Sequence, residues 1–346
     1  MIDPNSFSPE HIEKVRGFKK VDKTILERSI YALGLLEALV RVGLPFTFKG
    51  GTSMLLLLES PRRLSTDIDI VVKPGTDVES YLEEAAAILP FKYKEKQERK
   101  RSGSIVKQHY KFIYDSPAYG REFYILLDIL FEDDHYANTV RVPIRNDIVI
   151  TVPPYLYVTV PTADCLMGDK LTAFAPHTTG IPFGIGKELE IIKQMYDVSC
   201  LFEVFKDYDE LYSSYIATAN TEIAYRGLDI TFHDVLEDTI RSSACIASRG
   251  LIGDDYPLFL SGIRALSDHV FDRRFTAETA VDLACKVMYI AACLQTDSII
   301  NKIDDISSYQ DLLITDPEYS KLNKIRKISP EGFAYAYEAI DLLSKT

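Results

Sequence analysis

The sequence of 346 residues contains no tryptophan and only five cysteines. The cysteines are odd in number, scattered and never paired as Cys-x-x-Cys, which argues against a disulfide framework and a cysteine zinc site. None of the six histidines has the spacing of a zinc site either. No run of about 18 apolar residues could cross a membrane. The first residues, MIDPNSFSPEHIEKV, lack the basic start and apolar stretch of a signal peptide. These absences predict a cytoplasmic protein.

Negative charge is in excess, with a formal net charge of −12. Such an acidic balance disfavours a dedicated nucleic-acid binder. One segment departs from it, because residues 92–111, KYKEKQERKRSGSIVKQHYK, contain eight Lys or Arg and two Glu. The remainder of the chain therefore has a net charge of −18. The basic run is either a solvated hairpin or a surface that attracts phosphate groups.

Hydrophobic periodicity predicts an α+β N-terminal unit followed by an all-helical unit, divided near residue 160. The predicted helices of the first unit are residues 22–43, 53–59 and 77–89. Its predicted strands are residues 46–49, 67–72, 104–114, 122–131, 139–151 and 155–160, with a turn at Ser102-Gly103 before the third. The clearest helices of the second unit are residues 163–175, 187–205, 278–295 and 330–344.

Two aspartates, Asp67 and Asp69, lie one residue apart in the predicted strand DIDIVV. Alternate residues of a strand point to the same face, so both carboxylates converge on one spot. Carboxylates that close repel each other unless a cation neutralises them, and this spacing of hard oxygen ligands suits Mg²⁺. The alternative is the polar face of an edge strand with two solvated aspartates.

A glycine turn precedes this strand in the segment KGGTSMLLLLE. Gly50 and Gly51 allow a sharp turn and a close approach of the backbone to a ligand. Thr52 and Ser53 follow at the start of a predicted helix, whose free N–H groups and dipole attract anions. A triphosphate on this turn would reach metal ions at the two aspartates, while the leucines anchor the helix in the core. A plain strand-to-helix turn is the alternative.

A third carboxylate, Asp128, lies in the otherwise apolar predicted strand EFYILLDILF. A charge in such a strand is costly unless it is paired or bound to a metal. A third acid beside two metal ions suits phosphoryl transfer, in which one ion activates an attacking hydroxyl and the other stabilises the leaving pyrophosphate. The alternative is an ion pair with an arginine such as Arg63 or Arg121.

The stretch KGGTSMLLLLESPRRLSTDIDIVV resembles the first motif of the DNA polymerase β-like nucleotidyltransferases, a Gly-Gly/Ser-Thr/Ser turn followed by DxD. More narrowly, it is similar to the AbiEii/AbiGii-type toxins of bacterial toxin–antitoxin and abortive-infection systems, which have an arginine and a serine before the DxD. The corresponding downstream motifs are residues 168–182, GDKLTAFAPHTTGIP, and residues 190–202, EIIKQMYDVSCLF. Many members have an acid at the position of Gln194, where this chain departs from the pattern.

The resemblance implies a nucleotidyltransferase domain over residues 1–160, completed by a helical domain over 161–346. It implies Mg²⁺-dependent transfer of an NMP from an NTP to an acceptor hydroxyl, with two Mg²⁺ ions, the tRNA 3′ end as acceptor and a cognate antitoxin as partner. The candidate catalytic residues are Asp67, Asp69, Asp128, Lys170 and Asp197, of which the first three would bind metal. The candidate nucleotide-binding residues are Lys49, Gly50, Gly51, Thr52, Ser53, Ser65 and Lys170. The candidate RNA contacts are Lys92, Lys94, Lys96, Arg99, Lys100 and Arg101.

Other interpretations fit parts of the sequence. The same chemistry could act on a small molecule or a protein hydroxyl, because an acidic C-terminal half suits a cationic substrate. The chain could also be a non-catalytic toxin-like binding partner, although such a protein is expected to lose first-motif residues that this one retains. Lys170 alone reads as a solvated lysine on a helix. Lys193 and Asp197, at i and i+4, read as a surface ion pair worth a few tenths of a kcal/mol.

Overall fold

The computed structural model describes residues 1–17, 19, 21–97 and 106–345. The chain divides into two compact units, Met1–Ala163 with Asp268–Arg274, and Asp164–Ser267 with Phe275–Thr346. The first contains a mixed β-sheet with helices and the second contains helices, so the predicted α+β class is confirmed. Whether residues 1–160 and 161–346 behave as separate domains stays a prediction.

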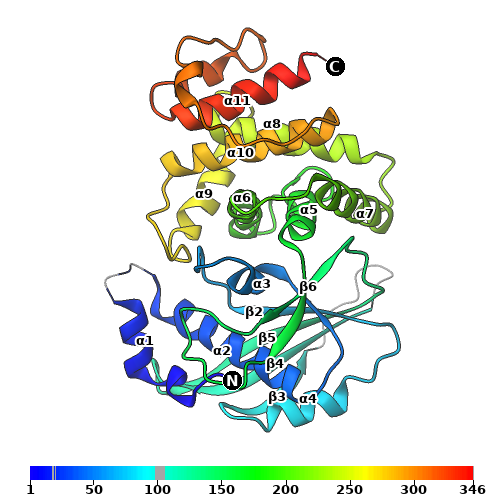
Figure 1. Ribbon diagram of the computed structural model, residues 1–346, viewed down its shortest axis with the longest axis vertical. Helices are drawn as coiled ribbons and strands as arrows, with labels where there is room; N and C mark the ends of the chain where they lie inside the picture. The colour runs from blue at the N-terminus through cyan, green and yellow to red at the C-terminus, as the bar shows by residue number, and fades with distance from the viewer. Residues whose placement is uncertain (18, 20, 98–105, 346) are drawn as a thin grey trace. The chain divides into compact units, whose positions relative to one another are not determined.

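A five-stranded mixed sheet organises the first unit (Figure 1). Its strands, in the order β1-β2-β5-β4-β3, are β1 (Thr47–Lys49), β2 (Asp67–Val72), β5 (Arg121–Phe131), β4 (Val106–Ser116) and β3 (Phe91–Gln97). Strands β2 and β5 are parallel, and the other neighbours are antiparallel. A second sheet pairs β6 (Thr139–Pro143) with β7 (Tyr157–Pro161). The strand predicted over residues 139–151 therefore ends earlier, at Pro143.

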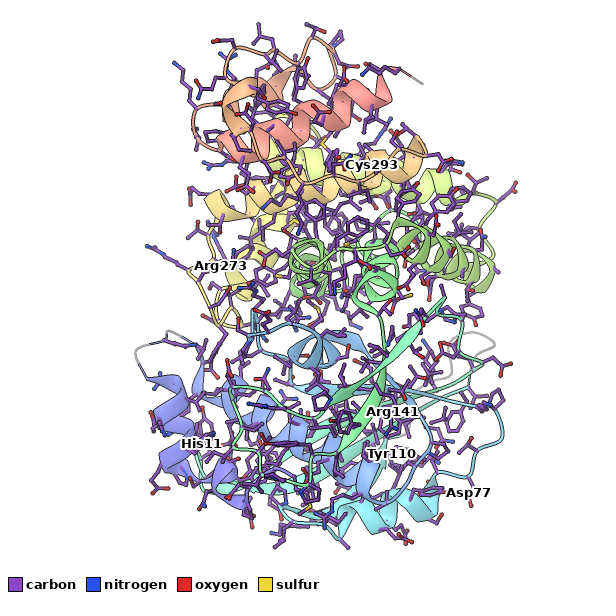
Figure 2. All side chains as sticks on the ribbon, viewed as in Figure 1. His11, Asp77, Tyr110, Arg141, Arg273 and Cys293 are labelled. Atoms are coloured by element: carbon purple, nitrogen blue, oxygen red, sulfur yellow. The ribbon has the colours of Figure 1, made fainter. Side chains whose placement is uncertain are left out.

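Helices cover one face of the five-stranded sheet. The side chains of Ile68 and Ile70 on β2, and of Leu127 on β5, pack in one hydrophobic core with α2 (Lys23–Arg41) and α4 (Glu79–Ala86). Tyr110 of β4 lies inside the same unit (Figure 2). Because successive strand residues face opposite sides, the intervening residues of β2 and β5 turn to the face opposite α2 and α4, which we call the open face. Those residues include all three predicted site carboxylates.

The other helical segments of the first unit are a 3₁₀ turn at Pro4–Phe7, α1 (Pro9–Arg16) and α3 (Gly50–Leu57). Residues 268–274 also belong to this unit, although they are distant in sequence. Their backbone bonds to the segment before β2, since Leu64 N donates to His269 O at 2.8 Å and Phe271 N donates to Arg62 O at 2.9 Å. This return segment therefore fixes the chain that leads into the DxD strand.

The second unit is built around α10 (Ala277–Gln295), a largely buried helix. It contacts α6 (Glu188–Phe202), α8 (Phe232–Ala247), α9 (Tyr256–Leu266) and α11 (Pro330–Leu343). The unit also contains α5 (Ala163–Ala173), α7 (Tyr208–Arg226) and 3₁₀ turns at Ile306–Tyr309 and Ser320–Ile325. All five cysteines are buried, and none of them forms a disulfide. Burial raises the pKa of the Cys245 thiol to about 11 and that of Cys293 to about 12, so neither is a reactive thiolate.

None of the helices in the described part of the chain combines the length and the apolar character needed to cross a membrane.

Candidate active site

Four side chains form a row across the open face of the sheet. Asp69 of β2 pairs in register with Lys49 of β1 on one side and with Asp128 of β5 on the other. Asp128 in turn pairs in register with His109 of β4. Partners in register share a face, so the row runs Lys49, Asp69, Asp128, His109. The two carboxylates predicted from separate strands are thus direct neighbours, with a cationic residue at one end.

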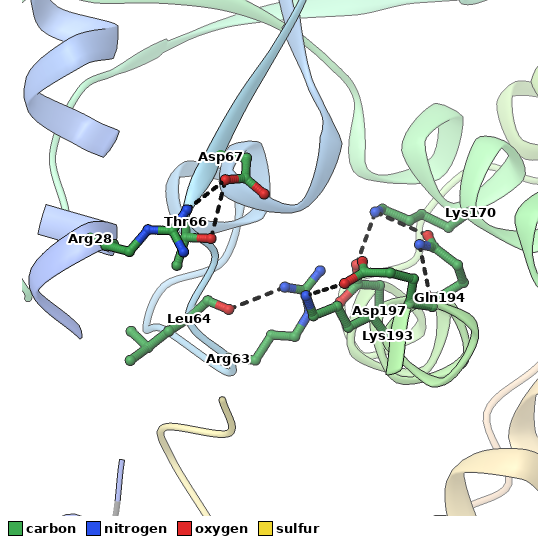
Figure 3. A network of polar contacts seen from close by, with 10 residues as sticks. Arg28, Arg63, Leu64, Thr66, Asp67, Lys170, Lys193, Gln194 and Asp197 are labelled. Atoms are coloured by element: carbon green, nitrogen blue, oxygen red, sulfur yellow. Dashed lines mark hydrogen bonds and ion pairs between the residues drawn. The ribbon is translucent and has the colours of Figure 1, made fainter. Parts of the chain in front are cut away.

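Asp67 lies two residues earlier on the same face, beside Leu126 of β5. The Arg28 guanidinium of α2 donates to its carboxylate, with 3.1 Å between Nη2 and Oδ1, and the Thr66 hydroxyl lies 3.3 Å from the same oxygen (Figure 3). Strand β2 lies between β1 and β5, so it is not an edge strand. The alternative of two solvated aspartates on an edge strand is therefore wrong.

The Asp128 carboxylate contacts a histidine rather than an arginine. His109 Nδ1 lies 2.7 Å from Asp128 Oδ1, and neither Arg63 nor Arg121 is its partner. The ring nitrogen holds the carboxylate at a fixed angle on the open face. Sequence reasoning missed both His109 and Arg28, because their pairing depends on the order and register of elements that are far apart in the chain.

The glycine turn brings the backbone against Asp69. Gly50 has φ +79°, a conformation that favours glycine, and a Cβ placed there would lie 2.1 Å from Asp69 Oδ2. Helix α3 begins at this glycine, three residues before the predicted start at Ser53. Within the described part of the chain, no side-chain hydrogen bond caps this end of the helix, where Lys49 is the N-cap residue. The uncapped first turn therefore presents its N–H groups next to the carboxylate row, as anion binding requires.

The second glycine makes room for two residues that precede the DxD. A Cβ on Gly51 would lie 2.5 Å from the Arg63 guanidinium Nη2 and 3.0 Å from the Ser65 hydroxyl. Arg63 is buried, and its Nη1 donates to Leu64 O at 3.2 Å. The arginine and the serine predicted as part of the first motif thus pack directly on the glycine turn.

Thr52 and Ser53 are fully buried, and their hydroxyls serve the turn itself. Thr52 Oγ1 donates to Asp67 O at 2.5 Å, and Ser53 Oγ donates to Gly50 O at 2.8 Å. The first bond ties α3 to the DxD strand. Leu55 is buried in the core, as expected of the leucine run. In this arrangement the two residues would meet a phosphate through their backbone N–H groups.

The donor set fits a hard divalent cation without forming a ready-made cage. Among the described residues, no three His, Cys, Asp or Glu side chains converge as a metal site. Mg²⁺ keeps several waters and is held by one or two carboxylates together with substrate phosphates, so a complete protein cage is not required. The neighbouring carboxylates of Asp69 and Asp128, beside a cradle that a Cβ at Gly50 would fill, meet that requirement.

Lys170 and Asp197 form a buried ion pair within the second unit. Lys170 Nζ lies 3.0 Å from Asp197 Oδ2 and 3.2 Å from Gln194 Oε1 (Figure 3). The Asp197 side chain is 0% exposed and that of Lys170 is 8% exposed. Neither residue is therefore solvated, and Lys193 instead pairs with Glu190 at 2.8 Å. The structure brings together these two predicted site residues, and their catalytic role stays a prediction.

The buried pair makes a stability prediction. Asp197→Asn leaves the Lys170 ammonium buried without its counter-charge, so we expect the free energy of unfolding to fall by about 3–5 kcal/mol. Glu190→Gln is the matched control, because it removes the exposed partner of Lys193 and is expected to cost about 0.5 kcal/mol or less. Urea denaturation of both variants measures the difference. Equal losses would contradict the structural distinction.

Three lysines at the start of the basic run, Lys92, Lys94 and Lys96, are already paired with carboxylates. Lys92 Nζ lies 3.1 and 2.9 Å from carboxylates of β4 and β5. Lys94 and Lys96 lie 2.7 and 3.3 Å from Glu79 of α4, on the helix-covered side of the sheet. Their role as RNA contacts stays a prediction. The remaining candidates lie outside the described residues: Arg99, Lys100 and Arg101.

The ion pairs of Glu79 with Lys94 and Lys96 predict an acid-sensitive contact between α4 and β3. The hydrogen bond from Lys94 lowers the pKa of Glu79 from 4.5 to about 2. A carboxyl whose pKa falls on folding stabilises the protein where it is ionised, so its contribution is complete above about pH 4.5 and lost near pH 2. Glu79 is half-exposed, and solvent screening limits the contribution to about 1 kcal/mol. Denaturant unfolding should therefore separate wild type from Glu79→Gln at pH 7, with the difference shrinking below pH 4.5. A constant difference would contradict this assignment.

Comparison with known proteins places this site in a class. Residues 34–280 match the family model described as "Nucleotidyl transferase AbiEii toxin, Type IV TA system". No curated protein matches the chain. Two crystal structures from Helicobacter pylori are similar, JHP933 and a protein described as a candidate nucleotidyltransferase. JHP933 is 11% identical with a TM-score of 0.46, and the match covers 78% of this chain and 93% of JHP933. The second protein is 12% identical with a TM-score of 0.45, and the match covers 78% of this chain and 96% of that protein.

The carboxylate row and the glycine turn lie within the matched residues, and the class is that of the nucleotidyltransferases. The chain belongs to the AbiEii toxin family of type IV toxin–antitoxin systems. Membership implies a nucleoside triphosphate as substrate and an antitoxin as partner. Residues 281–346, which include most of α10 and all of α11, lie beyond the match.

Proposed function

We propose that this chain transfers an NMP from an NTP to the 3′-hydroxyl of tRNA, and that two Mg²⁺ ions assist the transfer. The observation that carries the proposal is the contact between the glycine turn and the carboxylate row, in which Gly50 leaves no room for a Cβ beside Asp69. A triphosphate on the first turn of α3 would place its phosphates beside Asp69 and its neighbour Asp128.

The bonds exchanged in the proposed reaction are simple. The acceptor oxygen bonds to the α-phosphorus, the bond from that phosphorus to the bridging oxygen breaks, and pyrophosphate leaves while the hydroxyl proton passes to water. Backbone N–H groups of Gly50 to Ser53 would bind the β- and γ-phosphates, and Lys49 would lie beside them at the end of the row. Bound Mg²⁺ would supply charge neutralisation of the phosphates and activation of the hydroxyl.

Each side chain of the site has its own role in this proposal. Asp67, Asp69 and Asp128 would hold the metal ions, and His109 would fix the orientation of Asp128. Arg28 donates a hydrogen bond to Asp67 and would orient its carboxylate. Lys170 and Asp197 are assigned by family resemblance to the triphosphate and to the active site, respectively. Growth inhibition would follow from blocking the tRNA 3′ end, and binding of a cognate antitoxin would oppose it.

The experiment is a transfer assay with Mg²⁺, each of the four α-labelled NTPs in turn, and total cellular tRNA. The proposal predicts that label moves to RNA with one preferred NTP, and that EDTA abolishes the transfer. Release of pyrophosphate without labelled RNA, when small molecules or proteins are present, would show that the acceptor hydroxyl belongs to one of those molecules and not to tRNA. No transfer to any acceptor would overturn the proposal.

A further inference from the structure

An aromatic ring and two cations extend the site along the open face of the sheet. Tyr124 of β5 lies on the same face as Asp128, four residues away, and is 39% exposed. Lys111 Nζ of β4 lies 4.4 Å from the centroid of the Tyr124 ring, and the guanidinium carbon of Arg28 lies 5.8 Å from it. We call Tyr124, Lys111 and Arg28 the aromatic–cation cluster.

The register places this cluster next to the DxD strand. Leu126 of β5 lies between Asp67 of β2 and Lys111 of β4 in one cross-strand row. Tyr124 is two residues before Leu126 on the same face of β5 and is therefore a diagonal neighbour of Asp67. Arg28 joins the two, because its Nη2 lies 3.1 Å from Asp67 Oδ1. The cluster and the metal-binding carboxylates thus form one continuous surface.

The cluster retains bonding capacity for a ligand. Within the described ranges, Lys111 makes no ion pair with a carboxylate, unlike Lys92 and Lys94 of the same basic run. The Tyr124 hydroxyl has no hydrogen-bond partner there, and the Nε atom of Arg28 is buried without one. An exposed aromatic ring can stack on a nucleobase, and a neighbouring cation without a carboxylate partner can bind the phosphate of the same nucleotide.

The position of the cluster indicates which nucleotide it would bind, the incoming NTP or the terminal nucleotide of the acceptor. In phosphoryl transfer the attacking and leaving oxygens are roughly in line on opposite sides of the phosphorus. The glycine turn, where the leaving pyrophosphate would lie, follows β1 on one side of β2. The cluster is centred on β5 and β4, on the other side of β2. That is the side from which the attacking hydroxyl would approach.

We infer that the aromatic–cation cluster binds the terminal nucleotide of a single-stranded RNA acceptor. The base stacks on the Tyr124 ring, while Lys111 and Arg28 contact the phosphate. This inference rests on the proposed nucleotidyl transfer and adds the acceptor subsite to it. The other nucleobase in the reaction, that of the incoming NTP, is the alternative occupant.

The test is equilibrium binding of a 5′-fluorescein-labelled single-stranded RNA with a free 3′-hydroxyl, measured by anisotropy on the full chain without Mg²⁺. Tyr124→Leu should weaken RNA binding about tenfold, whereas Tyr124→Phe, which keeps the ring, should stay within about twofold. Lys111→Met should lower the slope of log affinity against log salt by about 1. Affinity for each NTP is measured in parallel on the same variants.

The matched control is Tyr157→Leu, since Tyr157 is 46% exposed and has Arg141 at 5.9 Å from its ring, on the separate β6–β7 sheet. It should leave RNA binding unchanged. Loss of NTP affinity in Tyr124→Leu with intact RNA binding would assign the cluster to the incoming base and overturn the inference. Unchanged binding of both would also overturn it. Because binding is measured without turnover, an RNA effect in a chain that shows no transfer would reject the proposed reaction and keep the subsite.

Discussion

Asp69→Asn should reduce nucleotidyl transfer about a thousandfold while leaving the fold at least as stable as wild type. The loss of rate follows from removing a negative charge that would hold the metal ions. The stability follows from the register, because Asp69 and Asp128 are direct cross-strand neighbours and like charges in that position destabilise a sheet. Neutralising one of them removes the repulsion. Transfer rate and thermal midpoint, measured on the same preparation, test both halves.

Asp128→Asn should behave in the same way, which separates the carboxylate pair from structural acids. Asp197→Asn is the contrast, because it should lower both activity and stability through a buried ion pair. A fall in the thermal midpoint of Asp69→Asn comparable with that of Asp197→Asn would mean that Asp69 is a structural residue. Full transfer activity in Asp69→Asn would remove it from the metal site.

Gly50→Ala should abolish most activity through a steric effect on Asp69. The new Cβ would lie 2.1 Å from Asp69 Oδ2, so the carboxylate or the turn has to move. A displacement of about 1 Å at a catalytic group can cost about a hundredfold in rate. The positive φ adds strain of about 1–2 kcal/mol for any residue with a Cβ. We therefore expect a loss of rate of about a hundredfold together with lower stability.

Gly75→Ala separates the two effects. Gly75 has φ +83°, close to that of Gly50, yet a Cβ there meets nothing within 4 Å. This variant should lose stability through the same backbone strain and keep its transfer rate within about twofold of wild type. Comparable rates in Gly50→Ala and Gly75→Ala would show that the close approach to Asp69 has no part in activity.

Local sequence patterns are sufficient to predict the strands and the helix that carry the candidate site residues. The alternation in DIDIVV predicts that Asp67 and Asp69 share a face, and β2 has the predicted bounds. The charge in an apolar run singled out Asp128, which lies on the open face as a neighbour of Asp69. The start of α3 was predicted three residues late, because a glycine with positive φ reads as a turn although here it begins the helix.

Partners set by long-range pairing could not be predicted. His109 meets Asp128 only because β4 pairs with β5 in one particular register, and nothing in the local pattern fixes that register. Arg28 reaches Asp67 from a helix 39 residues earlier in the chain. Lys170 reads as solvated from its own helix, and its burial depends on packing against α6.

The most direct test of the central claim is calorimetric binding of each NTP with and without Mg²⁺, on wild type and on Asp69→Asn. Metal ions held jointly by the carboxylate row and the phosphates predict that Mg²⁺ raises the affinity of wild type at least tenfold and has little effect on Asp69→Asn. The same Mg²⁺ enhancement in both proteins would contradict a metal–nucleotide site on this face of the sheet.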